Sequence, residues 1–139
     1  MTTGFVRFTL AHWCVLVAAL LPLLSGVIAK WGRVGVPRKQ GGYDNEDPRA
    51  WLANQGGWRA RANAAQANGF EGLPLFIGAV VIALQLGAPQ TRLDVLAFLY
   101  VVMRMIYIMM YVSGMATFRS IAWSLAFAVN LGIFFVGYR

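Results

Sequence analysis

Hydrophobic residues dominate four long stretches of the chain, and most polar residues lie between them. The apolar stretches cover residues 8–29, 72–90, 95–118 and 120–138. A helix crosses the roughly 30 Å hydrocarbon core of a bilayer in about 20 residues. The pattern therefore predicts an all-α integral membrane protein, a four-helix bundle with four transmembrane helices per subunit, in which residues 1–139 form a single domain.

The first apolar stretch also has features of a secretory signal. Arg7 precedes the apolar run, and the small residues Ser25 and Gly26 follow its centre. The run then continues through residues 27–29 without a small-x-small cleavage site, so we expect it to be retained as a membrane span.

The connection between the first and second spans divides into two parts. Residues 31–57 are rich in glycine, proline and charge, which predicts a loop with one short helix over residues 48–53. Residues 58–70 are rich in alanine and run directly into the second span. We therefore expect one long helix that begins in water and continues into lipid.

Basic residues make up most of the charge and are unevenly distributed. The net charge is +7, and seven of the twelve Lys and Arg side chains lie between the first and second spans. Because Lys and Arg are enriched in cytoplasmic loops, this connection is predicted to be cytoplasmic and both termini to lie on the opposite side. The charge follows membrane topology and gives no reason to expect a nucleic-acid partner.

The sequence offers few metal ligands. Cys14 is the only cysteine and His12 the only histidine. A cysteine metal cluster or an intrachain disulfide is therefore excluded, and no metal site is expected.

Ionisable and polar residues in or beside the apolar stretches are the candidates for function, because a charge in hydrocarbon costs several kcal/mol. Helical spacing places them on two stripes and one turn between the last two spans. The second helix carries Arg61, Asn68 and Glu71, the third carries Tyr100, Arg104, Tyr107 and Tyr111, and the turn carries Arg119 and Ser120. These groups predict a polar pocket at the cytoplasmic side of the bundle.

The amino-acid sequence of these segments resembles that of the MAPEG superfamily, the membrane-associated proteins in eicosanoid and glutathione metabolism. Residues 61–76 read RANAAQANGFEGLPLF, residues 104–111 read RMIYIMMY, and Arg119-Ser120 follows. The resemblance extends over nearly the whole chain, and the chain resembles a bacterial-type member of the superfamily. It implies a homotrimer that binds glutathione between adjacent subunits.

The resemblance also implies roles for the candidate residues. Arg61 and Arg104 would take the carboxylates of glutathione, Glu71 its ammonium group, and Asn68, Tyr107 and Tyr111 would add neutral hydrogen bonds. The catalytic residues would be Arg119, which stabilises the thiolate, and Ser120 beside it. The implied function is a glutathione-dependent transferase or peroxidase acting on a lipophilic small molecule that arrives from the membrane lipids.

Several alternatives stay open at this point. Ala64 and Ala67 stand where some relatives have basic residues, which favours a non-catalytic lipid-binding or scaffold member of the family. A small drug exporter is less consistent, because its acid within the first span is absent. Glu71 and an arginine could form a purely structural ion pair. Tyr100 is expected to pack, and Asn130 to bond across helices.

Overall fold

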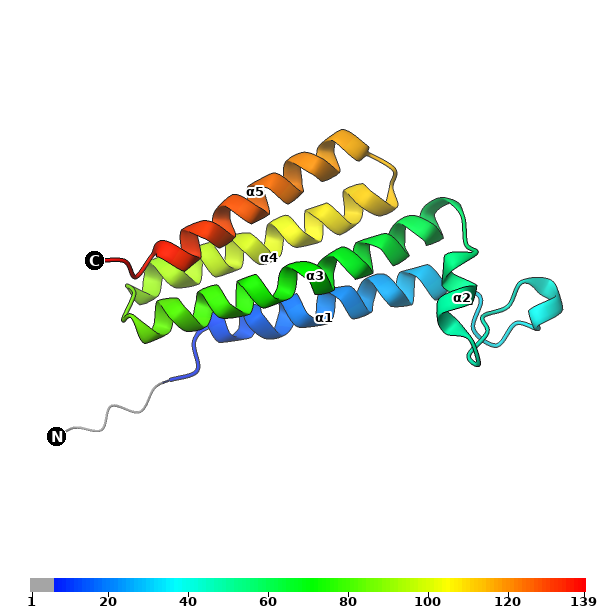
Figure 1. Cartoon of the computed structure of the whole chain (residues 1–139), viewed down its shortest axis with the longest axis horizontal. Coiled ribbons are helices and arrows are strands. Elements are labelled where there is room, and N and C mark those ends of the chain that lie inside the picture. Colours follow the sequence, from blue (N-terminus) through cyan, green and yellow to red (C-terminus); the bar gives the residue numbers. More distant parts are fainter. Residues whose placement is uncertain (1–6) are drawn as a thin grey trace.

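A computed structural model of the protein describes residues 7–139, and every regular element in that range is helical (Figure 1). Four helices are long and apolar enough to cross a membrane. They are α1 (Leu10–Lys30), α3 (Gly57–Gln85), α4 (Gln90–Val112) and α5 (Ala116–Phe135); α2 (Pro48–Ala53) and the short 3-10 helix η1 (Arg38–Gln40) lie in the first connection. The predicted all-α fold with four spans is confirmed.

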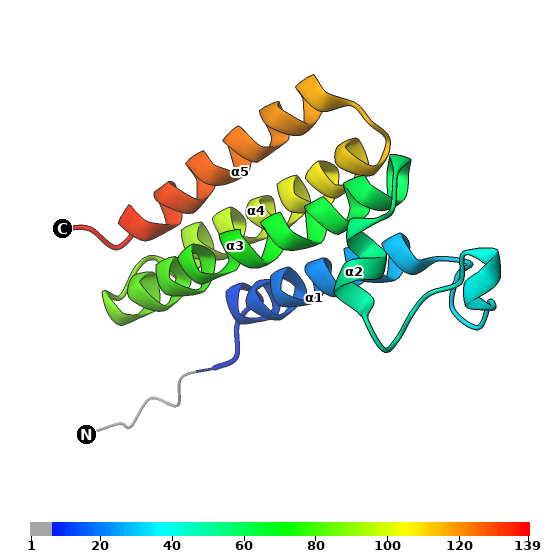
Figure 2. The ribbon, with the colours of Figure 1, turned by 45° about the vertical axis from the view of Figure 1, so that its right-hand side comes forward.

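The four long helices run alternately up and down the bundle. α3 and α4 lie in the middle, with α1 and α5 on opposite sides of this pair (Figures 1 and 2). The long connection over residues 31–56 and the short α4–α5 turn lie at one end of the bundle, which we call the loop end. The start of α1, the α3–α4 turn and the C-terminal residue lie at the other (Figure 1).

Small side chains let the helices approach one another closely. Ala79 and Ala83, one turn apart on α3, are completely buried. Gly69 on α3 faces Pro22 on α1, and a Cβ atom at Gly69 would lie 2.8 Å from Pro22 Cγ. Small residues at such contacts allow membrane helices to pack backbone against backbone. The alanine stripe of α3 therefore packs within the subunit.

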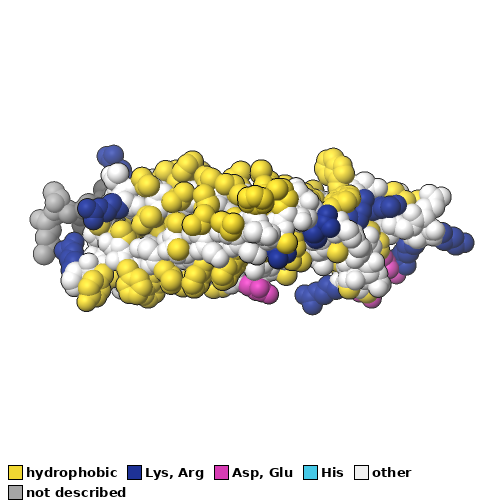
Figure 3. Space-filling view, turned by 90° about the horizontal axis from the view of Figure 1, so that it is seen from above, with side chains coloured by type: hydrophobic (Ala, Val, Ile, Leu, Met, Phe, Trp, Pro, Cys, Tyr) yellow, Lys and Arg dark blue, Asp and Glu magenta, His cyan; other side chains and the backbone are white. Residues whose placement is uncertain are grey.

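The outer surface is apolar along the middle of the bundle. Figure 3 shows hydrophobic side chains over the central part of one face, with Lys and Arg side chains gathered towards the two ends. Large exposed side chains such as Leu16, Val81, Phe98 and Leu125 come from all four long helices. A surface of this kind is stable when it faces lipid instead of water.

The end of the third span differs from its predicted position. α4 ends at Val112 and α5 begins at Ala116, so Arg119 lies inside the first turns of α5 and the turn is formed by residues 113–115. Gly114 has a φ of 79°, a left-handed conformation that glycine adopts without strain. The surrounding Val112, Met115 and Phe118 made this turn look like membrane span in the sequence.

A carboxylate from α4 holds the beginning of α1. The backbone N–H of Ala11 donates to Asp94 Oδ1 at 3.0 Å, and Gln90 Nε2 donates to the same oxygen at 2.8 Å. The first amides of a helix have no partner within the helix and form its positive end. Asp94 therefore satisfies one of them and links α1 to α4.

Candidate functional site

Arg104 is the most deeply buried charged side chain of the site. Only 6% of it is exposed, although it lies on a membrane-spanning helix. Its Nη2 donates to Asn68 Oδ1 on α3 at 2.9 Å, and its guanidinium lies 4.2 Å from the centre of the Tyr107 ring. A buried cation requires such partners, because desolvation otherwise costs several kcal/mol. The position of Arg104 between α3 and α4 is thus fixed from two sides.

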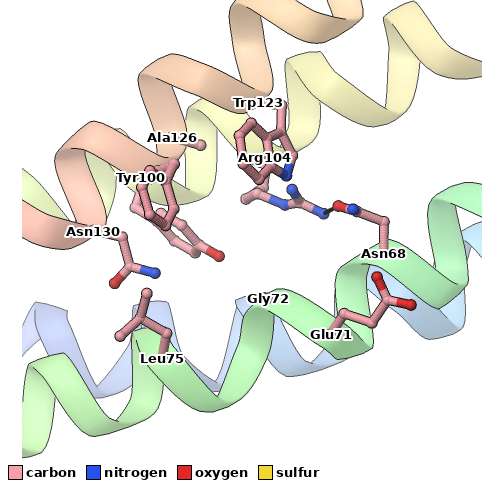
Figure 4. A pocket seen from close by; sticks show the side chains of 10 residues that line it. Asn68, Glu71, Gly72, Leu75, Tyr100, Arg104, Trp123, Ala126 and Asn130 are labelled. Atoms are coloured by element: carbon pink, nitrogen blue, oxygen red, sulfur yellow. Dashed lines mark hydrogen bonds between the residues drawn. The ribbon is translucent and has the colours of Figure 1, made fainter.

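Arg104 borders a cavity of about 210 Å³ between α3, α4 and α5, which we call the deep cavity (Figure 4). It is lined by Asn68, Glu71, Gly72 and Leu75 from α3, by Tyr100 and Arg104 from α4, and by Trp123, Ala126, Phe127 and Asn130 from α5. Two charged residues of opposite sign and several neutral polar groups therefore share one partly open space.

Glu71 is exposed at this cavity, one helical turn beyond Asn68 (Figure 4). Among residues 7–139, the ion pairs are those of Arg38 with Asp44 and Glu46 in the first connection. The structural ion pair considered for Glu71 is therefore not formed in the subunit. The carboxylate of Glu71 is available to a cationic group of a ligand.

A second cavity, of about 350 Å³, lies towards the loop end, and we call it the loop-side cavity. It is lined by Asn68 from α3, by Tyr107 and Tyr111 from α4, and by Arg119, Ser120, Trp123 and Ser124 from α5. The two cavities share Asn68 and Trp123. They form adjoining parts of one space along the side of α5 that faces α3 and α4.

Two arginine side chains with two tyrosine side chains between them form a row along the wall of this space. The Arg119 guanidinium lies 4.5 Å from the centre of the Tyr111 ring, and the Tyr107 and Tyr111 rings meet edge to face at 5.6 Å. Together with the Arg104–Tyr107 contact, this gives a continuous row from the deep cavity to the loop end. Such contacts hold the guanidinium groups in place and leave their N–H edges free to bind anions.

Arg61 lies at the same end of the bundle but lines neither cavity. Its Nε and Nη2 donate to the carbonyl oxygen of Val112 at 3.1 and 3.0 Å. Arg59 makes a comparable contact with the carbonyl oxygen of Ala29 at 3.1 Å. The last carbonyls of a helix lack partners within it. The two basic residues at the start of α3 therefore cap the ends of α4 and α1.

The structure brings together seven of the eight predicted site residues in the two adjoining cavities. It adds side chains of α5 that the sequence analysis did not select, of which Trp123 and Ser124 line the loop-side cavity together with Arg119. They follow Ser120 by three and four residues, so helical spacing from Ser120 would have placed them on the same face.

A comparison with protein families gives a match that includes the same residues. The MAPEG family model matches residues 10–138, which include every residue of both cavities and nearly the whole chain. The chain belongs to the MAPEG family. No curated protein and no solved structure gives a significant match. As a MAPEG protein, it is a multi-pass membrane protein of the family associated with eicosanoid and glutathione metabolism, and its site must be interpreted from its own residues.

Proposed function

We propose that this MAPEG protein is a glutathione-dependent transferase or peroxidase that acts on lipophilic electrophiles in the membrane. The observation that carries the proposal is the pair of adjoining cavities in which two arginines, one free carboxylate and several neutral hydrogen-bonding groups converge. Small-molecule sites usually enclose roughly 300–1,000 Å³ and place a few polar groups in an otherwise apolar lining.

Glutathione has the charges that this set of side chains can neutralise. It carries two carboxylates, one ammonium group and a thiol. The guanidinium of Arg104 offers N–H groups to a carboxylate beyond the one used by Asn68, and a pair of parallel N–H···O bonds is among the strongest polar contacts in proteins. Glu71 offers the only carboxylate lining either cavity and is suited to the ammonium group.

The rings of Tyr107 and Tyr111 lie between Arg104 and Arg119, and their hydroxyl groups would hold the peptide groups of glutathione. Both residues line the loop-side cavity, and their rings are already fixed against each other and against the arginines. A ligand that binds preformed groups loses less free energy to ordering them. Asn68, which borders both cavities, would contact the middle of the tripeptide.

The reactive thiol is best placed beside Arg119. Arg119 is the fourth residue of α5, so its side chain and the positive end of the helix act on the same space. A fixed positive charge lowers the pKa of a thiol, and the thiolate is the reactive nucleophile. Ser120, in the same cavity, can donate a hydrogen bond to the sulfur anion.

The proposed reaction is attack of this thiolate on an electrophile. In a conjugation, the sulfur forms a bond to carbon, the leaving group departs with the bonding electrons, and the thiol proton is released to solvent. In a peroxide reduction, two glutathione thiols are oxidised to the disulfide while the hydroperoxide becomes an alcohol and water. The electrophile would enter between α3 and α5, where exposed Leu75, Trp123 and Phe127 line the deep cavity.

The remaining parts of the proposal concern assembly and orientation. We propose a homotrimer in which a neighbouring copy covers the open side of the loop-side cavity and completes the glutathione site, while the deep cavity stays open to lipid between α3 and α5. The first connection faces the cytosol and the C-terminus the opposite side, as the basic residues at the loop end favour. Cross-linking in membranes and cysteine labelling at Gly41 and Arg139 positions from either side test these two statements.

Binding of glutathione to the purified full-length protein tests the proposed function directly. We expect saturable binding below millimolar concentrations by calorimetry in lipid nanodiscs. Arg104→Leu should weaken it more than tenfold, whereas Arg49→Ala, on exposed α2, should leave it unchanged. Absence of binding at millimolar glutathione would refute the proposal, and binding without turnover for any electrophile would favour the scaffold member.

A further inference from the structure

Asn130 places an unsatisfied polar atom in the membrane-spanning part of α5. Only 3% of the residue is exposed, and its Oδ1 is buried without a hydrogen-bond partner among residues 7–139. The cross-helix bond expected from the sequence is therefore not formed by this oxygen. A buried polar atom without a partner costs about 1–3 kcal/mol, so its presence in the otherwise apolar stretch 125–136 needs a reason.

The side chain of Asn130 ends at the deep cavity. In Figure 4 its amide lies at the far end of that cavity from Asn68, and the Tyr100 hydroxyl points into the space between them. The Tyr100 ring is held by stacking on Phe76, with ring centres 4.1 Å apart. Two neutral polar groups thus border an apolar space lined otherwise by residues such as Leu75, Ala126 and Phe127.

We propose that this end of the deep cavity is a subsite for a hydroxyl group of the lipophilic substrate. This inference rests on the proposed function, because it takes the ligand of the deep cavity to be the second substrate of that reaction. The substrate hydroxyl donates to Asn130 Oδ1 and accepts from the Tyr100 hydroxyl. In Figure 4 the amide nitrogen of Asn130 faces the cavity and the oxygen points away from it. A half-turn about the last torsion of Asn130, which is broad and roughly two-fold, exchanges the two atoms and turns the oxygen towards the cavity.

The chemistry of the lining selects a neutral hydroxyl over other polar groups. Beyond Arg104 the deep cavity has no charged side chain towards Asn130, so an ionised group would be bound there without a counter-charge. An ether or ketone can accept from Tyr100 but has no hydrogen for the asparagine oxygen. A hydroxyl does both, and it pairs the amide oxygen of Asn130, which has no hydrogen-bond partner among residues 7–139.

The position of Asn130 also sets a distance within the substrate. Ten residues separate Ser120 and Asn130 on α5, which corresponds to about 15 Å along the helix axis. The hydroxyl at Asn130 is therefore remote from the sulfur beside Arg119 and is not the reacting group. The substrate class is a lipophile whose electrophilic centre and hydroxyl lie roughly 15 Å apart.

Binding of two probes of equal size tests the subsite without glutathione. The probes are 1-octanol, which donates and accepts, and 1-methoxyheptane, which only accepts. Each is titrated into full-length protein in lipid nanodiscs, with empty nanodiscs titrated in parallel to subtract partitioning. We expect octanol to bind about tenfold more tightly, the value of one hydrogen bond of about 1.4 kcal/mol.

Three variants test which side chains cause the preference for octanol over methoxyheptane. Asn130→Leu should abolish the tenfold ratio. Tyr100→Phe should weaken both probes and keep the ratio, because both ligand oxygens accept from Tyr100. Asn63→Leu, the same substitution outside the cavity, should change nothing. The melting temperature of Asn130→Leu should equal or exceed that of the wild type, since the substitution removes an unpaired atom.

Equal binding of the two probes to the wild type would overturn the proposal, and so would a ratio that survives Asn130→Leu. A marked fall in the melting temperature or loss of the oligomer in Asn130→Leu would show that another copy of the chain already pairs this oxygen, and would overturn it too. Failure to bind glutathione would instead refute the proposed function, and it is measured separately.

Discussion

Substitution of Arg61 tests most directly which arginines stabilise the fold and which bind the ligand. Its guanidinium makes two hydrogen bonds, of 3.1 and 3.0 Å, to the last carbonyl of α4, and it lines neither cavity. Hydrogen bonds from a charged donor contribute roughly 1.5–3 kcal/mol when protected from water. Arg61 is half-buried, so we expect Arg61→Ala to cost about 1–2 kcal/mol.

This cost should be visible in thermal unfolding of the detergent-solubilised protein. By the scaling of soluble domains of similar length, a loss of 1–2 kcal/mol lowers the melting temperature by about 3–8 °C. Affinity for glutathione, measured by calorimetry below that temperature, should change less than threefold. The matched variant Arg104→Leu should behave in the opposite way, because it removes a desolvated charge from the cavity wall at little cost in stability.

The comparison of the two arginine variants can refute the reasoning in either direction. If Arg61→Ala unfolds at the wild-type temperature but loses glutathione binding tenfold, then Arg61 leaves Val112 to bind a ligand carboxylate, as the family resemblance implies. Arg49→Ala on α2 serves as the control for loss of one positive charge at the loop end, and it should alter neither quantity.

Three further substitutions have expected outcomes. Arg119→Ala should keep glutathione affinity within a few-fold but reduce the thiolate absorbance of the bound peptide and lower turnover at least tenfold; unchanged turnover would contradict the thiolate role. Asp94→Ala removes the acceptor at the start of α1 and should cost about 1 kcal/mol in thermal unfolding, with an unchanged melting temperature as the contrary result. Gly69→Ala pushes a methyl group against Pro22 and should cost about 1–3 kcal/mol, whereas Gly78→Ala, which meets no neighbour within 4 Å, should be tolerated; equal melting temperatures would speak against close packing of α1 and α3.

The spans could be predicted because hydrophobic length is a strong signal. The short helix α2 and the start of the long helix α3 also followed from Pro48 and from the change in composition at Gly57. The boundary between α4 and α5 could not be read in the same way. Its glycine turn lies among apolar side chains, so hydropathy continues across it while the backbone reverses.

For the candidate site, the sequence could predict only which residues share one face of the same helix. Spacing placed Asn68 with Glu71 and Arg104 with Tyr107, and their helices do bring them together. The contributions of α5 depend on how that helix is rotated against α3 and α4, which no local pattern defines. The same limit applies to Arg61, since its carbonyl partner lies 51 residues away in the chain.

The opening of the deep cavity between α3 and α5 has a kinetic consequence. A substrate that arrives through this opening is supplied from the two-dimensional solution of the bilayer, so the encounter rate follows its mole fraction among the lipids. Adding inert phospholipid at a constant total amount of substrate should then slow the reaction by surface dilution. Glutathione, which would arrive from water, should retain the same apparent affinity throughout such a dilution series.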